Sequence, residues 1–183
     1  VNSSRAGFPE VASSVLAALH HFGIPYRIWD LAKAPLAESE ALGCAGLLLA
    51  QARLGRALSR ESASALLRGV RDGAGLVSLD PWLPRYAPAF RRALGLRAGN
   101  GARSAVFRIA PGDSFVTAFR EPGEEIPLRA PASVTPLGGA GRALLRDDRG
   151  RAVLRAGRFG RGRWLWWGIS PEVWQPRVLG HGW

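Results

Sequence analysis

Apolar residues recur at helical spacing in two stretches of the first half of the chain. Along residues 9–22 they return every three or four positions until Gly23 ends the pattern, and the initial proline suits a first helical turn. In the second stretch Ser59 can cap a helix that Gly73 ends. The pattern therefore predicts helices over Pro9–Phe22 and Ser59–Arg71.

Short apolar or aromatic runs alternate with these helices. Tyr26–Leu31 is β-branched and aromatic, Ala45–Ala50 is continuously apolar, and Gly75–Leu79 follows the second helix directly. Continuous apolar runs are typical of strands covered on both faces, as in a parallel sheet flanked by helices. These three segments are therefore expected to be strands of a mainly parallel sheet.

Strand patterns dominate the second half of the chain. A short helix is expected at Pro88–Leu94, turns at residues 148–150 and 160–162, and an irregular excursion at Pro122–Gly141. The last turn is expected to close an antiparallel hairpin over Arg158–Trp167. The expected strands are Ala105–Ile109, Ser114–Phe119, Ala143–Arg146, Ala152–Phe159 and Arg163–Ile169.

A polar residue lies at or just after the end of each of the three expected parallel strands. Asp30, Gln51 and Asp80 would lie at the carboxyl ends of these strands, and ligands usually bind at that edge of such a sheet. An aspartate in this position is equally often a helix cap or an anchor for a loop. The three residues are candidate ligand-binding residues, and both interpretations stay open.

Three segments resemble known proteins: LAALHHFGIPYRIWDL, VRDGAGLVSLD and RFGRGRWLWWGISPEVW. They are similar to segments of class I glutamine amidotransferase-like domains, of the kind found in large bacterial proteins beside carbohydrate-active modules. The resemblance covers most of residues 11–174. It implies one flavodoxin-like three-layer α/β domain, with a mainly parallel sheet and a C-terminal antiparallel β-hairpin extension.

The catalytic residues of that superfamily are missing. Its active members resemble one another in a cysteine at a sharp turn after a strand and in a His-Pro-Glu motif after a late strand. The nearest match here is Ser170-Pro171-Glu172, and a serine hydroxyl cannot take the proton that imidazole accepts from a thiol near neutral pH. Cys44 precedes an apolar strand, so we expect a small half-buried residue and no nucleophile.

Length and composition agree with one domain. The 183 residues are 47% hydrophobic, and no apolar run approaches the roughly 18 residues of a membrane span. The polar start of the sequence and its lack of methionine lead us to expect an excerpt of a longer protein. Cys44 alone cannot form an internal disulfide, which leaves the cellular compartment open.

The net charge of +11 raises the question of a polyanionic partner. All basic residues except Lys33 are arginines, and they are scattered through the expected helices, turns and strands. The densest stretch, residues 142–163, also contains Asp147 and Asp148, whose side chains would point to opposite faces of a strand. A solvated arginine-rich surface is the favoured interpretation, and nucleic acid is not an expected partner.

No cofactor or metal site is predicted. His20 and His21 are adjacent on a helix and point about 100° apart, so they cannot bind one metal ion together. Neither of the glycine-rich turns, residues 73–75 and 138–141, has the spacing of a phosphate loop. Among the tryptophans, Trp164 and Trp166 should share one face of a strand, whereas a loop tryptophan such as Trp82 could stack on a sugar ring or on a neighbouring domain.

The leading interpretation is a non-catalytic amidotransferase-like accessory or ligand-binding domain of a larger, polysaccharide-acting protein. Its expected partners are carbohydrate and the neighbouring domains of the same polypeptide. The expectation of carbohydrate comes from the resemblance alone. Two alternatives stay open: a hydrolase with a site at the carboxyl edge of the sheet, and a polyanion-binding module. In a hydrolase the candidate residues should converge in a concave pocket. The residues of that hydrolase site would be Asp30, Asp80, Ser170 and Glu172. The full set of candidate ligand-binding residues is Asp30, Gln51, Asp80, Trp82, Ser170, Glu172 and Trp174.

Overall fold

The computed structural model describes residues 1–112 and 114–169. Its first helical stretch runs through α1 (Phe8–Val11), the π-helical turn η1 (Ala12–Leu16) and α2 (Ala17–His21), as predicted from the apolar spacing. Only Val11 of this stretch is buried, and the side chain of Phe22 is 69% exposed. Most of the apolar face of the helix therefore lacks the cover that core helices have.

The second predicted helix is confirmed as α4 (Arg60–Asp72), with the caps that the sequence indicates. Ser59 Oγ accepts a hydrogen bond from the backbone N–H of Ser62, and Gly73 ends the helix at a φ of 130°. The predicted helix α6 (Pro88–Leu94) is also confirmed. The remaining helical elements are α3 (Glu38–Leu42), α5 (Leu83–Tyr86) and the 3₁₀ turns η2 (Leu54–Arg56) and η3 (Phe115–Thr117).

Seven strands form one mixed sheet in the order β1-β2-β9-β8-β7-β4-β5, and β3 pairs with β6 in a second, two-stranded sheet. Among the described residues, β1 pairs with β2 and β2 pairs with β9 in parallel, and the other strand pairings are antiparallel. The strands are β1 (Gly46–Leu49), β2 (Gly75–Ser78), β3 (Leu96–Ala98), β4 (Ala102–Ile109), β5 (Glu125–Val134), β6 (Leu137–Gly139), β7 (Arg142–Asp147), β8 (Ala152–Phe159) and β9 (Gly162–Trp167).

The α/β class is thus confirmed, but the sheet is mixed and not mainly parallel as expected. Short turns join β7 to β8 and β8 to β9, and a short turn can join only antiparallel neighbours. The predicted hairpin is confirmed: Phe159 pairs with Gly162, so β8 and β9 are joined at Gly160 and Arg161. None of the helices in residues 1–112 and 114–169 could span a membrane.

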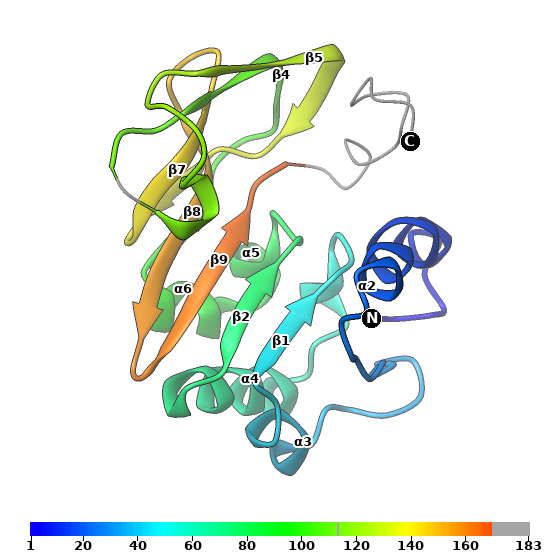
Figure 1. The fold of residues 1–183 in the computed structure, drawn as a ribbon. Helices are drawn as coiled ribbons and strands as arrows, with labels where there is room; N and C mark the ends of the chain where they lie inside the picture. Colours follow the sequence, from blue (N-terminus) through cyan, green and yellow to red (C-terminus); the bar gives the residue numbers. More distant parts are fainter. Residues whose placement is uncertain (113, 170–183) are drawn as a thin grey trace.

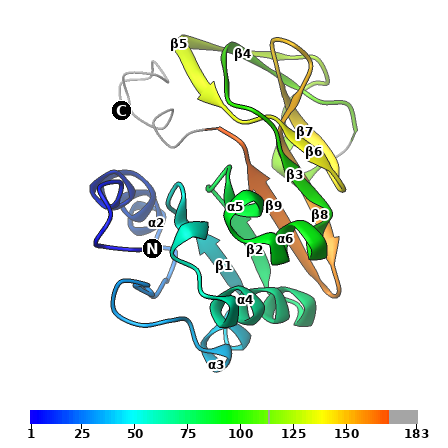
Figure 2. The same ribbon diagram turned by 180° about the vertical axis from the view of Figure 1, so that it is seen from behind.

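Helices α4, α5 and α6 cover one face of the parallel strands, as the two opposite views show (Figures 1 and 2). Trp164 and Trp166 lie on this face, 3% and 1% exposed, in a core shared with Phe90. Trp167 points to the other face and packs, half-buried, against a second core formed by the antiparallel strands. The prediction that Trp164 and Trp166 share one face of the strand is confirmed.

Three expected elements are wrong. Tyr26–Leu31 is not a strand: the backbone there has no regular secondary structure, and the side chains of Tyr26 and Ile28 are each 45% exposed. Ser114–Phe119 contains a 3₁₀ turn instead of a strand, because the Ser114 hydroxyl accepts a hydrogen bond from the N–H of Val116 and curls the chain. Pro122–Gly141, expected to be irregular, contains β5 and β6.

The prolines of β5 explain the last error. Pro127 and Pro131 cannot donate to a strand ladder, but β5 lies at the edge of the sheet, where one row of backbone groups needs no partner. Helix α5 was missed for a related reason. Pro84 occupies its first turn, where a proline is tolerated although in a sequence it commonly indicates a loop.

Candidate functional site

Asp80 lies two residues after the end of β2, at the carboxyl end of the parallel strands, and its side chain is fully buried. One carboxylate oxygen accepts hydrogen bonds from the backbone N–H groups of Arg53 (2.9 Å) and Trp82 (3.0 Å). The other accepts from the N–H of Gly55 at 2.9 Å. Its backbone carbonyl accepts from Nε1 of Trp166 at 2.9 Å. Asp80 thus ties together the loops that follow β1 and β2, and fixes them to the core.

Burial is the strongest electrostatic influence on this carboxylate and raises the pKa of Asp80. The three backbone N–H donors and the charge of Arg5 act in the opposite direction and are outweighed. Arg53 has a left-handed backbone, with a φ of 58°, and its guanidinium lies over the ring of Trp82, 5.2 Å from the centroid. One face of the Trp82 ring is therefore already occupied, while the side chain as a whole is half-buried.

Gln51 follows β1 and is 1% exposed. Its side-chain oxygen accepts from the N–H of Asn2 at 2.8 Å, and its side-chain nitrogen donates to the carbonyl of Asn2 at 3.2 Å. The amide therefore satisfies both backbone groups of one residue. The contact holds the amino-terminal segment, residues 1–3, against the carboxyl end of β1.

Asp30 holds the same segment from the opposite side. Its carboxylate accepts from the N–H of Ser3 (2.9 Å), from the Ser3 hydroxyl (2.5 Å) and from the N–H of Ala32 (3.0 Å). The hydroxyl of Ser3 is the largest influence among these bonds, and together they lower the pKa of Asp30 to about 2. Asp30 and Gln51, which are 21 positions apart in the sequence, are thus brought together by their shared contact with residues 1–3.

The described candidate residues therefore already have polypeptide partners. Backbone groups of loops or of the amino-terminal segment bind each of Asp30, Gln51 and Asp80. These N–H donors carry no signal in the sequence, which is why sequence reasoning could place the three side chains but not their contacts. Ser170, Glu172 and Trp174 lie outside the described residues, so their expected position near Asp80 stays a prediction.

Cys44 lies in the connection from α3 to β1 and is half-buried, as expected. Its thiol donates to the backbone carbonyl of Glu40 at 3.1 Å. This is a helix-to-strand connection, whereas a superfamily nucleophile would occupy a turn after a strand. His20 and His21 are exposed on α2. Within residues 1–112 and 114–169 no cluster of three or more His, Cys, Asp or Glu could hold a metal ion.

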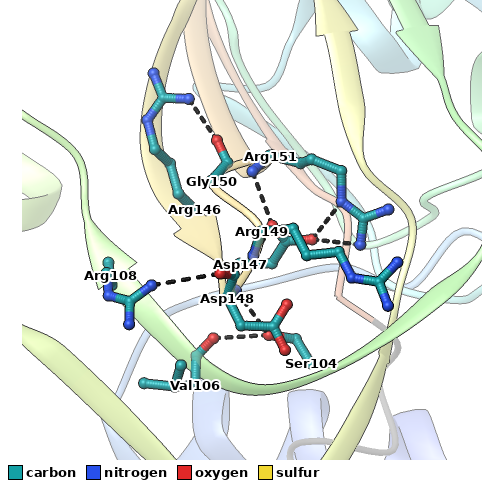
Figure 3. A network of polar contacts seen from close by, with 9 residues as sticks. All are labelled: Ser104, Val106, Arg108, Arg146, Asp147, Asp148, Arg149, Gly150 and Arg151. Atoms are coloured by element: carbon teal, nitrogen blue, oxygen red, sulfur yellow. Dashed lines mark hydrogen bonds and ion pairs between the residues drawn. The ribbon is translucent and has the colours of Figure 1, made fainter.

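A second buried aspartate, Asp147, organises the turn between β7 and β8 (Figure 3). It accepts from the N–H groups of Arg149 (3.1 Å) and Arg151 (2.8 Å) and from Nε of Arg151 (2.7 Å). The adjacent Asp148 is exposed, and its N–H donates to the hydroxyl of Ser104. This pair of carboxylates is divided between the inside and the outside of the fold, as its position on a strand predicted.

Several arginines of this region are also engaged. Arg108 forms an ion pair with Glu125 at 2.6 Å, and Arg146 donates to the carbonyl of Gly150 at 2.7 Å. Arg155 donates to consecutive carbonyls of the preceding turn, including that of Ala140 at 2.8 Å. Several guanidinium groups of the densest arginine stretch thus donate hydrogen bonds to the protein itself, which weakens the case for a polyanion site there.

A hollow of about 460 Å³ lies beside η3, away from these residues. Ile109, Phe115, Arg120 and Pro122 contribute to its lining, and none of the candidate residues does. A small internal gap of about 10 Å³ beneath β2 and β9 is lined mainly by core residues. Asp30, Gln51 and Asp80 line neither of these two cavities, and Ser170 and Glu172 lie outside the described residues, so the convergence expected of a hydrolase stays a prediction.

No protein-family model matches the sequence, and no curated protein matches it either. Solved structures match the fold. The cytoplasmic protein STM1381 from Salmonella typhimurium LT2 has a TM-score of 0.64 at 10% identity, over 91% of this chain and 76% of that one. A Bacteroides uniformis protein described as ThuA-like has a TM-score of 0.62 at 11% identity, over 92% of this chain and 79% of that one.

The exo-β-1,4-mannosidase Op5Man5 from Opitutaceae bacterium strain TAV5 is also similar, with a TM-score of 0.55 at 15% identity. The match covers 92% of this chain but only 29% of the mannosidase. Likeness at these identities establishes the fold alone. Because ThuA-like proteins belong to the glutamine amidotransferase-like superfamily, the fold agrees with the resemblance carried by the sequence.

Proposed function

We propose that this chain is a non-catalytic amidotransferase-like module that serves a larger protein, one that acts on polysaccharide. The proposal rests on the hydrogen bonds that the polar side chains at the carboxyl ends of the parallel strands form within the protein. The carboxylate of Asp80 is fully buried and accepts three backbone hydrogen bonds. The side-chain amide of Gln51 forms hydrogen bonds with the backbone of Asn2. Residues at the usual ligand edge thus act as anchors for loops and for the amino-terminal segment.

This use of the side chains argues against acid–base or nucleophilic chemistry at the edge. A catalytic carboxylate or thiol needs a lone pair that can reach the substrate, and a nucleophile needs an adjacent base. Asp80 has its oxygens engaged within the protein, and the Cys44 thiol lies at the opposite end of β1, bonded to a backbone carbonyl. Any chemistry there would first have to break contacts that hold the loops.

The association with polysaccharide is supported by the similar part of the mannosidase, where this fold makes up under a third of a carbohydrate-active chain. In such a protein the module would pack against neighbouring domains of the same polypeptide. We extend the proposal to a flavodoxin-like three-layer arrangement. Val77 and Leu165 lie on the sheet face opposite α4 and are only half-buried. A third layer packed against this face would bury them.

Glutamine hydrolysis tests the non-catalytic assignment. We expect ammonia release from glutamine to stay at the level of a heat-denatured control, both for the chain itself and for Ser170→His. A restored imidazole would have no correctly placed thiolate to activate. Hydrolysis by the unmodified chain that disappears in Cys44→Ala would overturn the assignment.

Affinity electrophoresis in gels containing β-1,4-mannan tests the carbohydrate contact separately. If Trp82 stacks on a sugar ring, the chain migrates more slowly in mannan gels and Trp82→Ala reduces the retardation. Trp29→Ala is the matched control, because it removes a half-buried tryptophan away from the loop after β2. Equal migration with and without mannan would remove carbohydrate from the proposal and leave the packing role.

A further inference from the structure

Exposed arginines occupy both loops at the carboxyl end of the parallel strands. Arg53 precedes and Arg56 ends the 3₁₀ turn η2 after β1, and Arg85 lies in α5 after β2; all three are exposed. The two elements touch, because a Cβ added to Gly55 would lie 3.2 Å from the Cβ of Tyr86. Residues 53–56 and 82–86 therefore form one continuous surface, called here the arginine surface.

Two of these arginines are held against aromatic rings. The guanidinium of Arg53 lies over Trp82, 5.2 Å from the ring centroid, and that of Arg56 lies over Tyr86 at 4.3 Å. Nη2 of Arg56 also donates to the Tyr86 hydroxyl at 2.7 Å. A guanidinium stacked on a ring keeps most of its N–H groups at its edge, where they can reach an anion. Because the stacking restricts both side chains, binding an anion costs them less conformational entropy.

The positive charge of this surface is not neutralised by ion pairs. Residues 51–60 and 81–100 contain arginines but neither aspartate nor glutamate. In the part of the chain that the structure describes, the arginines that form ion pairs are Arg27, Arg68, Arg108, Arg120 and Arg151. Asp80, which ties the two loops together, is fully buried and accepts its hydrogen bonds from backbone N–H groups. The guanidinium groups of Arg53, Arg56 and Arg85 are therefore available to an anionic ligand.

We propose that the arginine surface binds the carboxylates of an acidic polysaccharide, a chain built of uronic acids. This inference rests on the function proposed above, which supplies the polysaccharide, and it names the chemical class of that polysaccharide. The planar fork of a guanidinium matches a carboxylate and can bind it through two hydrogen bonds. A uronic acid polymer repeats its carboxylate at every sugar, so one chain can contact guanidinium groups on both loops.

The covered aromatic rings favour this ligand over two others. A neutral sugar ring or a nucleic acid base would need a free aromatic face on which to stack. Trp82 and Tyr86 are half-buried, and a guanidinium already lies over one face of each ring. A uronic acid can instead pair with the guanidinium that covers the ring. Nucleic acid also gains its affinity from many phosphate contacts, which a surface with three arginines does not offer.

NMR titration of the backbone amides with two hexasaccharides tests the inference. The probes are β-1,4-linked hexamannuronate and β-1,4-linked mannohexaose, which share a backbone and differ in a carboxylate or a hydroxymethyl group on each sugar. We expect hexamannuronate to bind about tenfold more tightly and to shift the signals of Gly55 and Tyr86. Arg56→Gln should weaken its binding about fivefold, as expected for the loss of one exposed charge pair. Arg149→Gln is the matched control, because Arg149 is an exposed arginine of the β7–β8 turn, and should weaken binding less than about twofold.

Arg85→Gln gives a second variant that leaves the fold intact. Within the described residues the Arg85 side chain forms no hydrogen bond or ion pair, so its replacement removes a charge and no internal contact. We expect it to weaken hexamannuronate binding about threefold to fivefold. A third probe, single-stranded hexathymidylate, carries a similar charge on phosphates and should bind more weakly than hexamannuronate.

Three results would overturn the inference. They are equal affinities for the two hexasaccharides, an effect of Arg149→Gln as large as those of Arg56→Gln and Arg85→Gln, and hexathymidylate binding as tight as that of hexamannuronate. The function proposed above is judged separately. If mannohexaose binds as well as hexamannuronate, carbohydrate stays in that function and only the acidic class is wrong. If neither binds, the inference fails, while the non-catalytic assignment still depends on glutamine hydrolysis alone.

Discussion

Replacing Asp80 by asparagine should destabilise the fold, because it exchanges one carboxylate oxygen for an amide nitrogen of nearly the same size. The oxygen that accepts from Arg53 and Trp82 can be kept. The new NH₂ group then faces the N–H of Gly55, whose partner oxygen was 2.9 Å away. Two donors oppose each other in a buried position, and neither can be satisfied by water.

The size of the effect follows from this single lost contact. A hydrogen bond to a charged group contributes about 1.5–3 kcal/mol, and the neutral amide avoids part of the desolvation that raises the pKa of Asp80. We therefore expect Asp80→Asn to lower the free energy of unfolding by about 2 kcal/mol. Asp80→Ala removes the acceptors of all three N–H groups, and should cost about twice as much.

Urea unfolding followed by tryptophan fluorescence measures the difference. The midpoint should fall while the slope with denaturant stays the same, which shows that stability and not compactness has changed. Asp148→Asn is the matched control: Asp148 is exposed, and its replacement should change the free energy of unfolding by less than about 0.5 kcal/mol. If Asp80→Asn is as mild as this control, Asp80 does not anchor the loops and its assigned role is wrong.

Three further outcomes are expected. Asp147→Asn should lower the free energy of unfolding by about 2 kcal/mol in the same urea assay, because it removes the charge of a buried carboxylate that pairs with the partly exposed Arg151; a loss below about 0.5 kcal/mol would contradict this. Gly162→Ala should cost at least about 3 kcal/mol, since its Cβ would lie 2.0 Å from a carbonyl oxygen of α4, whereas Gly101→Ala meets nothing and should be nearly neutral. The lowered pKa of Asp30, about 2 against an ordinary 3.8, adds stability above pH 4 that is lost towards pH 2; NMR titration should show Ser3→Ala raising this pKa, and an unchanged value would refute the contact.

The elements that sequence reasoning placed correctly are those with local signals. Ser59 and Gly73 delimit α4 through cap geometry that depends on a few neighbouring residues, and the Gly160–Arg161 turn fixes the last hairpin in the same way. Tyr26–Leu31 has the composition of a strand, but in the described structure it forms backbone hydrogen bonds to Val1 at its carboxyl end and pairs with no strand. Strand formation requires a neighbouring strand, and composition cannot supply it.

The sequence predicted where the candidate side chains lie in the fold but not which groups they bind. Asp30, Gln51 and Asp80 could be assigned to the ends of apolar runs. Their partners are backbone groups at Asn2, Ser3 and the loop after β1, mostly more than 20 positions away. Any residue type except proline supplies the same N–H, so no pattern in the sequence distinguishes an anchoring aspartate from a ligand-binding one.

Gln51 and Asp30 both bind the amino-terminal segment, residues 1–3, beside the carboxyl end of β1. Holding this segment is a structural task that needs no free lone pair. Residues committed to these contacts cannot also move protons for a substrate without releasing the segment. The contacts of Gln51 and Asp30 therefore argue against catalysis at this edge of the sheet.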